Sequence, residues 1–253
     1  MSGQAPWGRA SKKVDLKSFL STMHSLNTDH ASAYPPSMES SQTFNPDDFE
    51  RSVYRVCPSP LSSFDRRECP DRFVGRISEL AALRDWKAAA EQPPIRRTDL
   101  PCIVLVLESP HIDEYGLKQP YTPWPANGAT GRHIRKRAGL LVPPGWNSFE
   151  TQLHLINAIP YQCSLGQAPR LYRSKVFREA WASGAREYFQ ERLQQIYRKG
   201  DLVVNACTVG KPGPSLRALV EAAIAEVLPH ALRSRREHPF RWMSDEAVRR
   251  TWK

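Results

Sequence analysis

Carboxylate, amide and imidazole side chains follow apolar stretches that have the length of buried β-strands. Glu108 and Asp113 come after the apolar run 102–107, Asn157 ends a second run, and His238 lies near the C-terminus. A carboxylate can stabilise a developing positive charge or orient water, and an imidazole can hydrogen-bond a leaving oxygen. These residue types predict a site that breaks a polarised bond, and we take the four as candidate catalytic residues.

Each of these side chains also has a purely structural interpretation. A carboxylate could cap a following helix, Asn157 could satisfy loop backbone groups, and His238, which precedes a proline, could be a surface turn residue. Their shared position beyond strand ends favours one common site, because parallel sheets bind ligands beyond the carboxyl ends of their strands.

Patterns that specify several other chemistries are missing from the sequence. The histidines and cysteines show no paired metal spacing, residues 128–131 form neither a Walker nor a dinucleotide-binding pattern, and there is no G-x-S-x-G. We therefore expect no metal and no organic cofactor.

Charge and composition indicate the kind of partner. The 253 residues include 36 Lys and Arg against 26 Asp and Glu, and the net charge of +10 favours a nucleic acid over a generally soluble basic surface. The five cysteines are odd in number and irregularly spaced, which indicates a reducing compartment, and no apolar run reaches the ~20 residues that span a bilayer. We expect a cytoplasmic protein without membrane contact.

Alternating strands and helices must position the site. Short β-branched runs predict buried strands, and apolar residues at helical spacing predict helices. The predicted strands are 102–107, 153–159 and 201–205, and the predicted helices are 73–92, 175–198 and 215–227. This alternation is typical of an α/β fold with a parallel sheet and helices on its faces.

Residues 1–72 differ from the rest of the chain because they are rich in Ser, Pro, Asp and Asn. Apolar residues at helical spacing predict one short helix there, at 14–26. We interpret residues 1–72 as a helical and irregular N-terminal arm, and residues 73–253 as the catalytic domain.

Taken in order, the motifs resemble those of the uracil-DNA glycosylase superfamily. Residues 107–116, LESPHIDEYG, are similar to its first motif, GEAPG..E or GQDPYHG, with Glu108 and Pro110 at matching places. Residues 125–131 are similar to its PF-x-G-x-AG element, and residues 154–169 to the phrase in which an Asn ends its second strand.

The last motif of that superfamily, HPS, is similar to residues 238–240, HPF, and His230 is a weaker alternative for its histidine. The resemblance covers about residues 73–245. It implies a three-layer α/β/α sandwich with a central, mainly parallel four-stranded sheet. It also implies a DNA glycosylase in which Asn157 reads a flipped base and His238 hydrogen-bonds the leaving oxygen, while a carboxylate stabilises the sugar cation.

Departures from the superfamily pattern point to a different base. Leu107 replaces the usual Gly, His111 stands where Gly or Tyr is usual, and the four-cysteine iron–sulfur pattern of one branch is missing. The ESPH…EY opening and HPF-x-W ending look like an anti-phage branch that removes glucosylated 5-hydroxymethylcytosine from bacteriophage DNA. The resemblance therefore implies excision of a modified cytosine in antiviral defence.

The loop after residue 107 would line the base pocket, although its aromatic residues could instead only pack the loop. A base enlarged at C5 needs polar or stacking groups where a uracil-selective enzyme has a blocking ring. Besides Tyr121, the candidate base- and sugar-binding residues are Ser109, His111, Glu114, Tyr115, Trp124 and Asn127.

Basic residues near the first and last motifs would contact double-stranded DNA, although a solvated charged face is the alternative. Phe240 or Trp242 could wedge into the duplex. The candidate DNA-binding residues are Arg132, Arg135, Lys136, Arg236, Arg241 and Phe240. We expect a monomer bound to DNA with modified cytosines.

Three other functions remain open from the sequence. The chain could repair uracil or another damaged base, it could be a DNA-binding or sensing module without catalysis, or it could hydrolyse a small nucleotide. Acidic Glu108 and Asp113 oppose phosphate and so weigh against a pure binding module, and the charge of +10 exceeds what a mononucleotide needs.

Overall fold

The sheet at the centre of the computed structural model has the strand order β1-β3-β2-β4-β5. The structure describes residues 44–59, 64–83, 96–116, 122–211 and 213–249. β2 pairs in parallel with β3 and β4, β5 adds in parallel to β4, and β1 adds antiparallel to β3. The strands are β1 (Arg72–Arg76), β2 (Cys102–Leu107), β3 (Gln152–Asn157), β4 (Leu202–Asn205) and β5 (Leu232–Arg235).

β2 is the centre of the molecule because all six of its residues are buried. Its side chains alternate between two cores, so that Val104 and Val106 face one and Ile103 and Leu105 face the other. A strand covered on both faces must be apolar throughout, which explains the continuous run that the sequence shows here.

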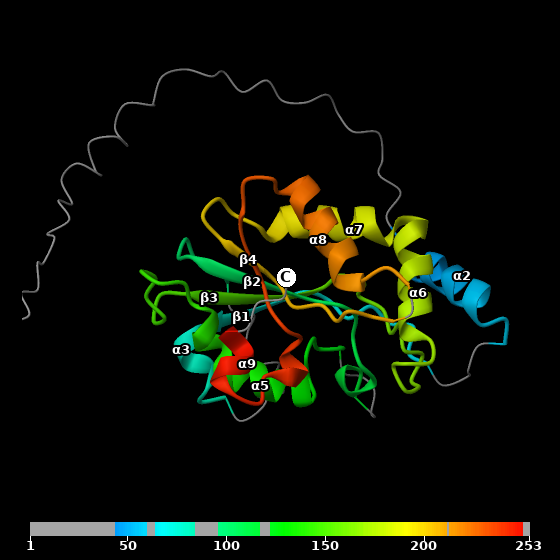
Figure 1. Cartoon of the computed structure of the whole chain (residues 1–253), viewed down its shortest axis with the longest axis horizontal. Coiled ribbons are helices and arrows are strands. Elements are labelled where there is room, and N and C mark those ends of the chain that lie inside the picture. The colour runs from blue at the N-terminus through cyan, green and yellow to red at the C-terminus, as the bar shows by residue number, and fades with distance from the viewer. Residues whose placement is uncertain (1–43, 60–63, 84–95, 117–121, 212, 250–253) are drawn as a thin grey trace, which may run out of the picture. The chain divides into compact units, whose positions relative to one another are not determined.

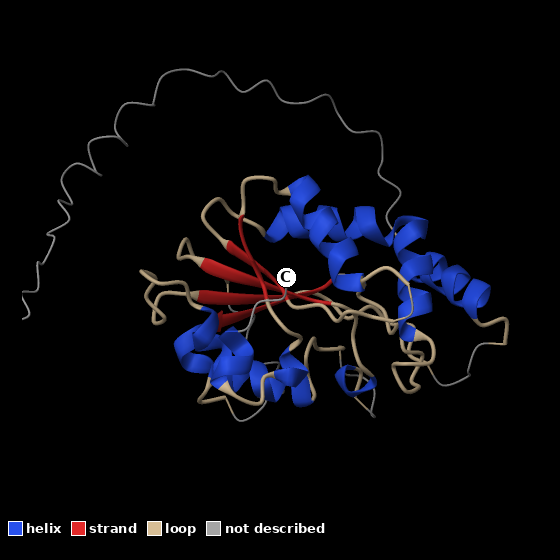
Figure 2. Cartoon of the chain, viewed as in Figure 1, coloured by secondary structure: helices blue, strands red, loops and turns tan. Residues whose placement is uncertain are grey.

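Helices cover both faces of the sheet (Figures 1 and 2). α6, α7 and α8 pack on one face through residues such as Phe177, Leu193 and Ile224, and α2 joins them through Phe49. α3, α5 and α9 lie on the other face, where Ile134 and Val248 enter the second core. The helices are α2 (Pro46–Val56), α3 (Ile77–Leu80), α5 (Ala129–Arg137), α6 (Arg173–Ala180), α7 (Arg186–Ile196), α8 (Leu216–Val227) and α9 (Asp245–Arg249). Short helical turns are η1 (Ile112–Glu114), η2 (Ala138–Leu141), η3 (Trp181–Ala185) and η4 (Pro239–Arg241).

The α/β architecture predicted from the sequence is confirmed at this level, but the described sheet has five strands where four were predicted. The predicted helix 73–92 is wrong at its start, because residues 72–76 form the antiparallel strand β1 and only Ile77–Leu80 is helical. Residues 84–95 of that prediction lie outside the described part.

The predicted helix 175–198 is interrupted in the structure. α6 and α7 are separated by the wide turn η3, in which Ser183 and Gly184 leave helical geometry and Gly184 adopts φ +115°. A side chain is disfavoured at such a φ, so glycine permits this break.

The predicted boundary at residue 73 places too much of the chain in the arm. α2 begins with a capping box in which Asn45 and Asp48 exchange hydrogen bonds, and its Phe49 and Val53 are fully buried in the first core. Phe49 stacks on Tyr161, with ring centroids 4.9 Å apart. The predicted helix at 14–26 lies outside the described residues.

None of the helices in the described ranges combines the length and apolar character needed to cross a membrane.

Candidate active site

A cavity of about 880 Å³ opens at the carboxyl edge of the parallel strands. The register places Leu107 beside Asn157, Val106 beside Asn205 and Asn205 beside Arg235, so the four parallel strands end at the same edge. The segments that follow β2, β3, β4 and β5 all contribute to the cavity wall, together with the N-terminus of α5. This is where open parallel sheets bind ligands.

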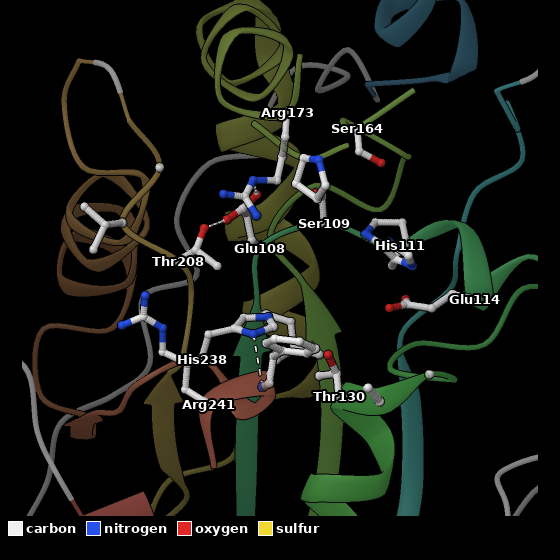
Figure 3. Close-up of a pocket in the computed structure, with 18 of the residues that line it drawn as sticks. Glu108, Ser109, His111, Glu114, Thr130, Ser164, Arg173, Thr208, His238 and Arg241 are labelled. Atoms are coloured by element: carbon white, nitrogen blue, oxygen red, sulfur yellow. Dashed lines mark hydrogen bonds and ion pairs between the residues drawn. The ribbon is translucent and has the colours of Figure 1, made fainter. Parts of the chain in front are cut away.

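Glu108 forms the floor of the cavity directly after β2 and is 2% exposed. Arg173 Nε lies 3.0 Å from its Oε1, and Thr208 Oγ1 donates a hydrogen bond to its Oε2 (Figure 3). Burial raises the pKa of Glu108 to about 7, even though the Arg173 guanidinium and the Thr208 backbone favour the anion. The carboxylate is thus poised to ionise near neutral pH.

Glu114 also faces the cavity and is 6% exposed. Burial raises its pKa to about 8, despite backbone hydrogen bonds from His111 and Ala126 and the nearby Asn157 amide. The Cys69 thiol lies 3.9 Å from its Oε2. Glu114 is therefore a neutral carboxylic acid at pH 7 and can donate a hydrogen bond.

His238 approaches from the segment after β5 and also lines the cavity (Figure 3). Burial, with the nearby positive charges of Arg173, Arg217 and Arg241, lowers its pKa to about 3. The Phe240 backbone N–H donates to His238 Nδ1 at 3.3 Å. A neutral imidazole that accepts at Nδ1 carries its proton on Nε2, so this histidine is an uncharged donor. The alternative His230 is exposed and is not part of the cavity wall.

Asp113 and His111 lie at the exposed mouth of the cavity, where Asp113 Oδ2 is 3.3 Å from His111 Nδ1. Gly128 packs against this carboxylate so closely that an added Cβ would lie 2.8 Å from Asp113 Oδ2. Ser109 lines the cavity as well. The structure therefore brings together Glu108, Asp113 and His238 of the predicted catalytic set.

Asn157, the fourth predicted catalytic residue, is 1% exposed and does not line the cavity. Its Nδ2 lies 3.8 Å from Cys69 Sγ, behind Glu114. Arg192 of α7 donates to the Asn157 backbone carbonyl at 2.8 Å and pairs with Asp71 at 2.8 Å. This network fixes the end of β3 and holds the Asn157 amide beside Glu114, while Asn157 Oδ1 has no hydrogen-bond partner among the described residues.

Three predicted base-binding residues lie outside the cavity wall. Tyr115 is buried and packs beneath the Arg67 guanidinium, Trp124 lies under Arg72, and Asn127 Nδ2 donates to the Asp113 carbonyl. Tyr115 and Trp124 therefore pack the loop and are not part of the wall of this cavity. Tyr121 lies outside the described residues.

The predicted DNA-contacting residues divide into exposed and buried positions. Arg132 and Lys136 are exposed on α5, and Arg135 is partly exposed. Arg241 and Phe240 border the cavity, and Phe240 is 59% exposed. Burial lowers the pKa of the partly buried Arg236.

Trp242, the second candidate for a wedge into the duplex, is fully buried. Its Nε1 donates to the Glu237 carbonyl at 2.8 Å, and its side chain belongs to the second core. Only Phe240 of the two aromatic candidates can reach a ligand.

Sequence reasoning missed several residues that complete the wall. Arg173 begins α6, Thr208 follows β4, Ser164 follows β3, and Arg217 lies in α8. The sequence contains a weak indication that Thr208 belongs to the site, because Thr208 follows the end of a predicted strand. It contains no such indication for Arg173 and Arg217, since an arginine in a helix is ordinarily a surface residue.

In the described part of the chain, no group of three or more His, Cys, Asp or Glu side chains is arranged to hold a metal ion. No family model, no curated protein and no solved structure matches the chain.

Proposed function

We propose that the protein is a DNA glycosylase that flips a modified base out of duplex DNA and excises it, leaving an abasic site. The observation that carries this proposal is the convergence of buried Glu108 and neutral His238, from different strand ends, on one cavity. A carboxylate and an uncharged donor that line the same cavity suit a bond that separates charge.

In the proposed reaction the C1′–N bond breaks and its electron pair leaves with the base. Water then bonds to C1′, and its proton ends on the departing base. Positive charge grows on the sugar, and the Glu108 carboxylate stabilises it as carboxylates do in glycoside hydrolysis.

Negative charge grows on the base, where His238 Nε2–H and the protonated Glu114 can donate hydrogen bonds. Burial keeps both groups uncharged near pH 7, and each carries the proton that it donates in the hydrogen bond.

The size of the cavity supports a base larger than uracil. Its volume of about 880 Å³ lies near the upper end of the ~300–1,000 Å³ typical of ligand sites. Together with the resemblance of the motifs, this favours glucosylated 5-hydroxymethylcytosine of bacteriophage DNA as substrate, and antiviral defence as the role.

Duplexes that carry a single uracil, cytosine, 5-hydroxymethylcytosine or glucosylated 5-hydroxymethylcytosine test the proposal. After incubation, alkali cleaves the strand only where a base was excised. We expect cleavage of the glucosylated duplex and its loss in Glu108→Gln. Cleavage of the uracil duplex alone would indicate a repair glycosylase, and tight binding without cleavage of any duplex would indicate a binding module.

A further inference from the structure

The cavity has a polar side whose residues contact neither the sugar nor the base ring in the proposed reaction, although two of them, Arg173 and Thr208, hold Glu108. Figure 3 shows Arg173, Thr208 and Ser164 on one side, across from Thr130 and Arg241. The residues assigned to bond cleavage need contact only the sugar and the base ring. The polar side is therefore available to another part of the ligand.

Ser164 is the first indication that this side meets a ligand. It is 4% exposed and lines the cavity, yet its Oγ has no hydrogen-bond partner among the described residues. A buried hydroxyl without a partner costs about 1–3 kcal/mol, and a ligand that bonds it recovers this energy.

The backbone that presents Ser164 is strained. Leu165, the next residue, is fully buried and adopts φ +53°, a conformation that residues with side chains rarely occupy. The turn is held by the Leu165 N–H, which donates to the Gln162 carbonyl, and by the Gln167 N–H, which donates to the Ser164 carbonyl. Such strain persists only where the surroundings hold it, so Ser164 is fixed in place.

Arg173 and Thr208 are likewise held in place through Glu108. The ion pair uses Nε of Arg173, which leaves the terminal nitrogens of a side chain that is 25% exposed and borders the cavity. Thr208 gives its proton to Glu108, so its oxygen retains lone pairs that can accept. The side thus offers guanidinium donors and hydroxyl acceptors in fixed positions.

We infer that Ser164, Arg173 and Thr208 form a subsite for an uncharged, hydroxyl-rich substituent carried by the excised base. Sugar hydroxyls both donate and accept, as this mixed set of partners requires. A phosphate fits less well, because the charge of Arg173 is already balanced by Glu108. The inference rests on the proposed function, and it assigns sugar recognition to these residues in place of Tyr115 and Trp124.

Measuring the affinity for duplexes that cannot be cleaved separates sugar recognition from catalysis. We would measure Kd by fluorescence anisotropy for duplexes with cytosine, 5-hydroxymethylcytosine or its glucosylated form. A 2′-fluoro sugar at that nucleotide prevents cleavage, because fluorine disfavours positive charge at C1′. We expect wild type to prefer the glucosylated duplex, and Ser164→Ala to reduce the preference about 3- to 10-fold, the effect of one lost hydrogen bond.

Arg173→Lys keeps the charge but removes the planar fork, so we expect it to reduce the preference at least about 10-fold. Thr208→Val should also reduce the preference, and Thr208→Ser should restore it. Ser183→Ala and Arg55→Lys are matched controls, because these residues line a separate small cavity between α2 and η3. Thermal unfolding of each variant checks that the fold is intact.

The outcomes distinguish this subsite from the proposed function. A preference for the glucosylated duplex that these variants weaken supports the subsite even if no base is excised. Equal loss of affinity for all duplexes, or an unchanged preference in all variants, would overturn the subsite while leaving an observed glycosylase activity intact. A wild-type protein with no preference would overturn it as well.

Discussion

At the scale of single residues, Glu108 illustrates two opposing effects. Burial behind the cavity wall favours its neutral form, whereas Arg173 and Thr208 favour its anion. Burial is the larger effect, and the pKa rises to about 7. A carboxylate with this pKa is only partly ionised at neutral pH, and it becomes a full anion when the pH rises by about one unit.

This balance predicts a bell-shaped pH dependence of excision. The rate should rise through about pH 7 as Glu108 ionises, and fall above about pH 8 as Glu114 loses the proton that it donates. Single-turnover rates between pH 5.5 and 9.5 on the glucosylated duplex measure both limbs.

Two variants assign the limbs of this profile. Glu108→Gln should lower the rate about 10²- to 10³-fold and remove the rising limb, since the charge near C1′ is lost. Glu114→Gln keeps a neutral donor, so it should retain activity and remove the falling limb. A rate that decreases through pH 7 in wild type would contradict the role of Glu108 as the anion.

The site could be predicted from the sequence only in part. Glu108 and Asp113 were found because they follow a predicted strand, where a core does not need polar groups, and His238 was found through its similarity to the last motif of the superfamily. Arg173 and Thr208 were not assigned to the site, because their contact with Glu108 joins positions 65 and 100 residues away in the chain. Tyr115 and Trp124 were predicted to line the pocket from their residue type alone, but in the structure their side chains pack against Arg67 and Arg72.

At the scale of elements, burial explains which strands the sequence revealed. β2 is buried throughout and reads as a continuous apolar run, CIVLVL. β3 is also buried throughout, although its sequence, QLHLIN, mixes apolar and polar residues. β5 reads LRSR and lies at the sheet edge with three of its four residues exposed, so neither hydrophobicity nor alternation marks it. β1 was taken for a helix because Ile77 and Leu80 follow it at helical spacing.

The break between α6 and α7 gives a prediction at this scale. Gly184→Ala should lower the free energy of unfolding by about 1–2 kcal/mol, because alanine is strained at φ +115°, while its Cβ would make only an ordinary contact with Phe44 at 3.5 Å. Urea denaturation measures this change.

Gly139→Ala is the control for that substitution. Gly139 lies in η2 without a positive φ, and an added Cβ would meet no atom within 4 Å. We expect little change or a slight gain in stability there. If both variants lose stability equally, the special geometry at Gly184 is not the cause.

At the scale of the whole molecule, the two edges of the sheet differ: one holds a buried ion pair and the other holds the cavity. The amino edge is closed by a buried ion pair between Arg97 and Asp201, at 2.5 Å, which also receives the Cys102 backbone N–H. The carboxyl edge holds the cavity, with exposed Arg241 in its wall and exposed Arg132 in α5, the helix whose N-terminus also lines the cavity. A duplex that delivers a base to this cavity must therefore lie against the basic residues of the carboxyl edge.

The affinity for duplex DNA should consequently depend steeply on salt, because cations that contact phosphates release counterions. A plot of log affinity against log salt concentration should have a slope that falls by about 1 in Arg132→Gln and again in Arg241→Gln. The matched control is Lys199→Gln, an equal loss of charge at an exposed position just before β4, at the amino edge. Its slope should equal that of wild type, because a duplex at the carboxyl edge does not reach it. Equal changes in all three variants would mean that the net charge of +10, and not its arrangement around the cavity, attracts the DNA.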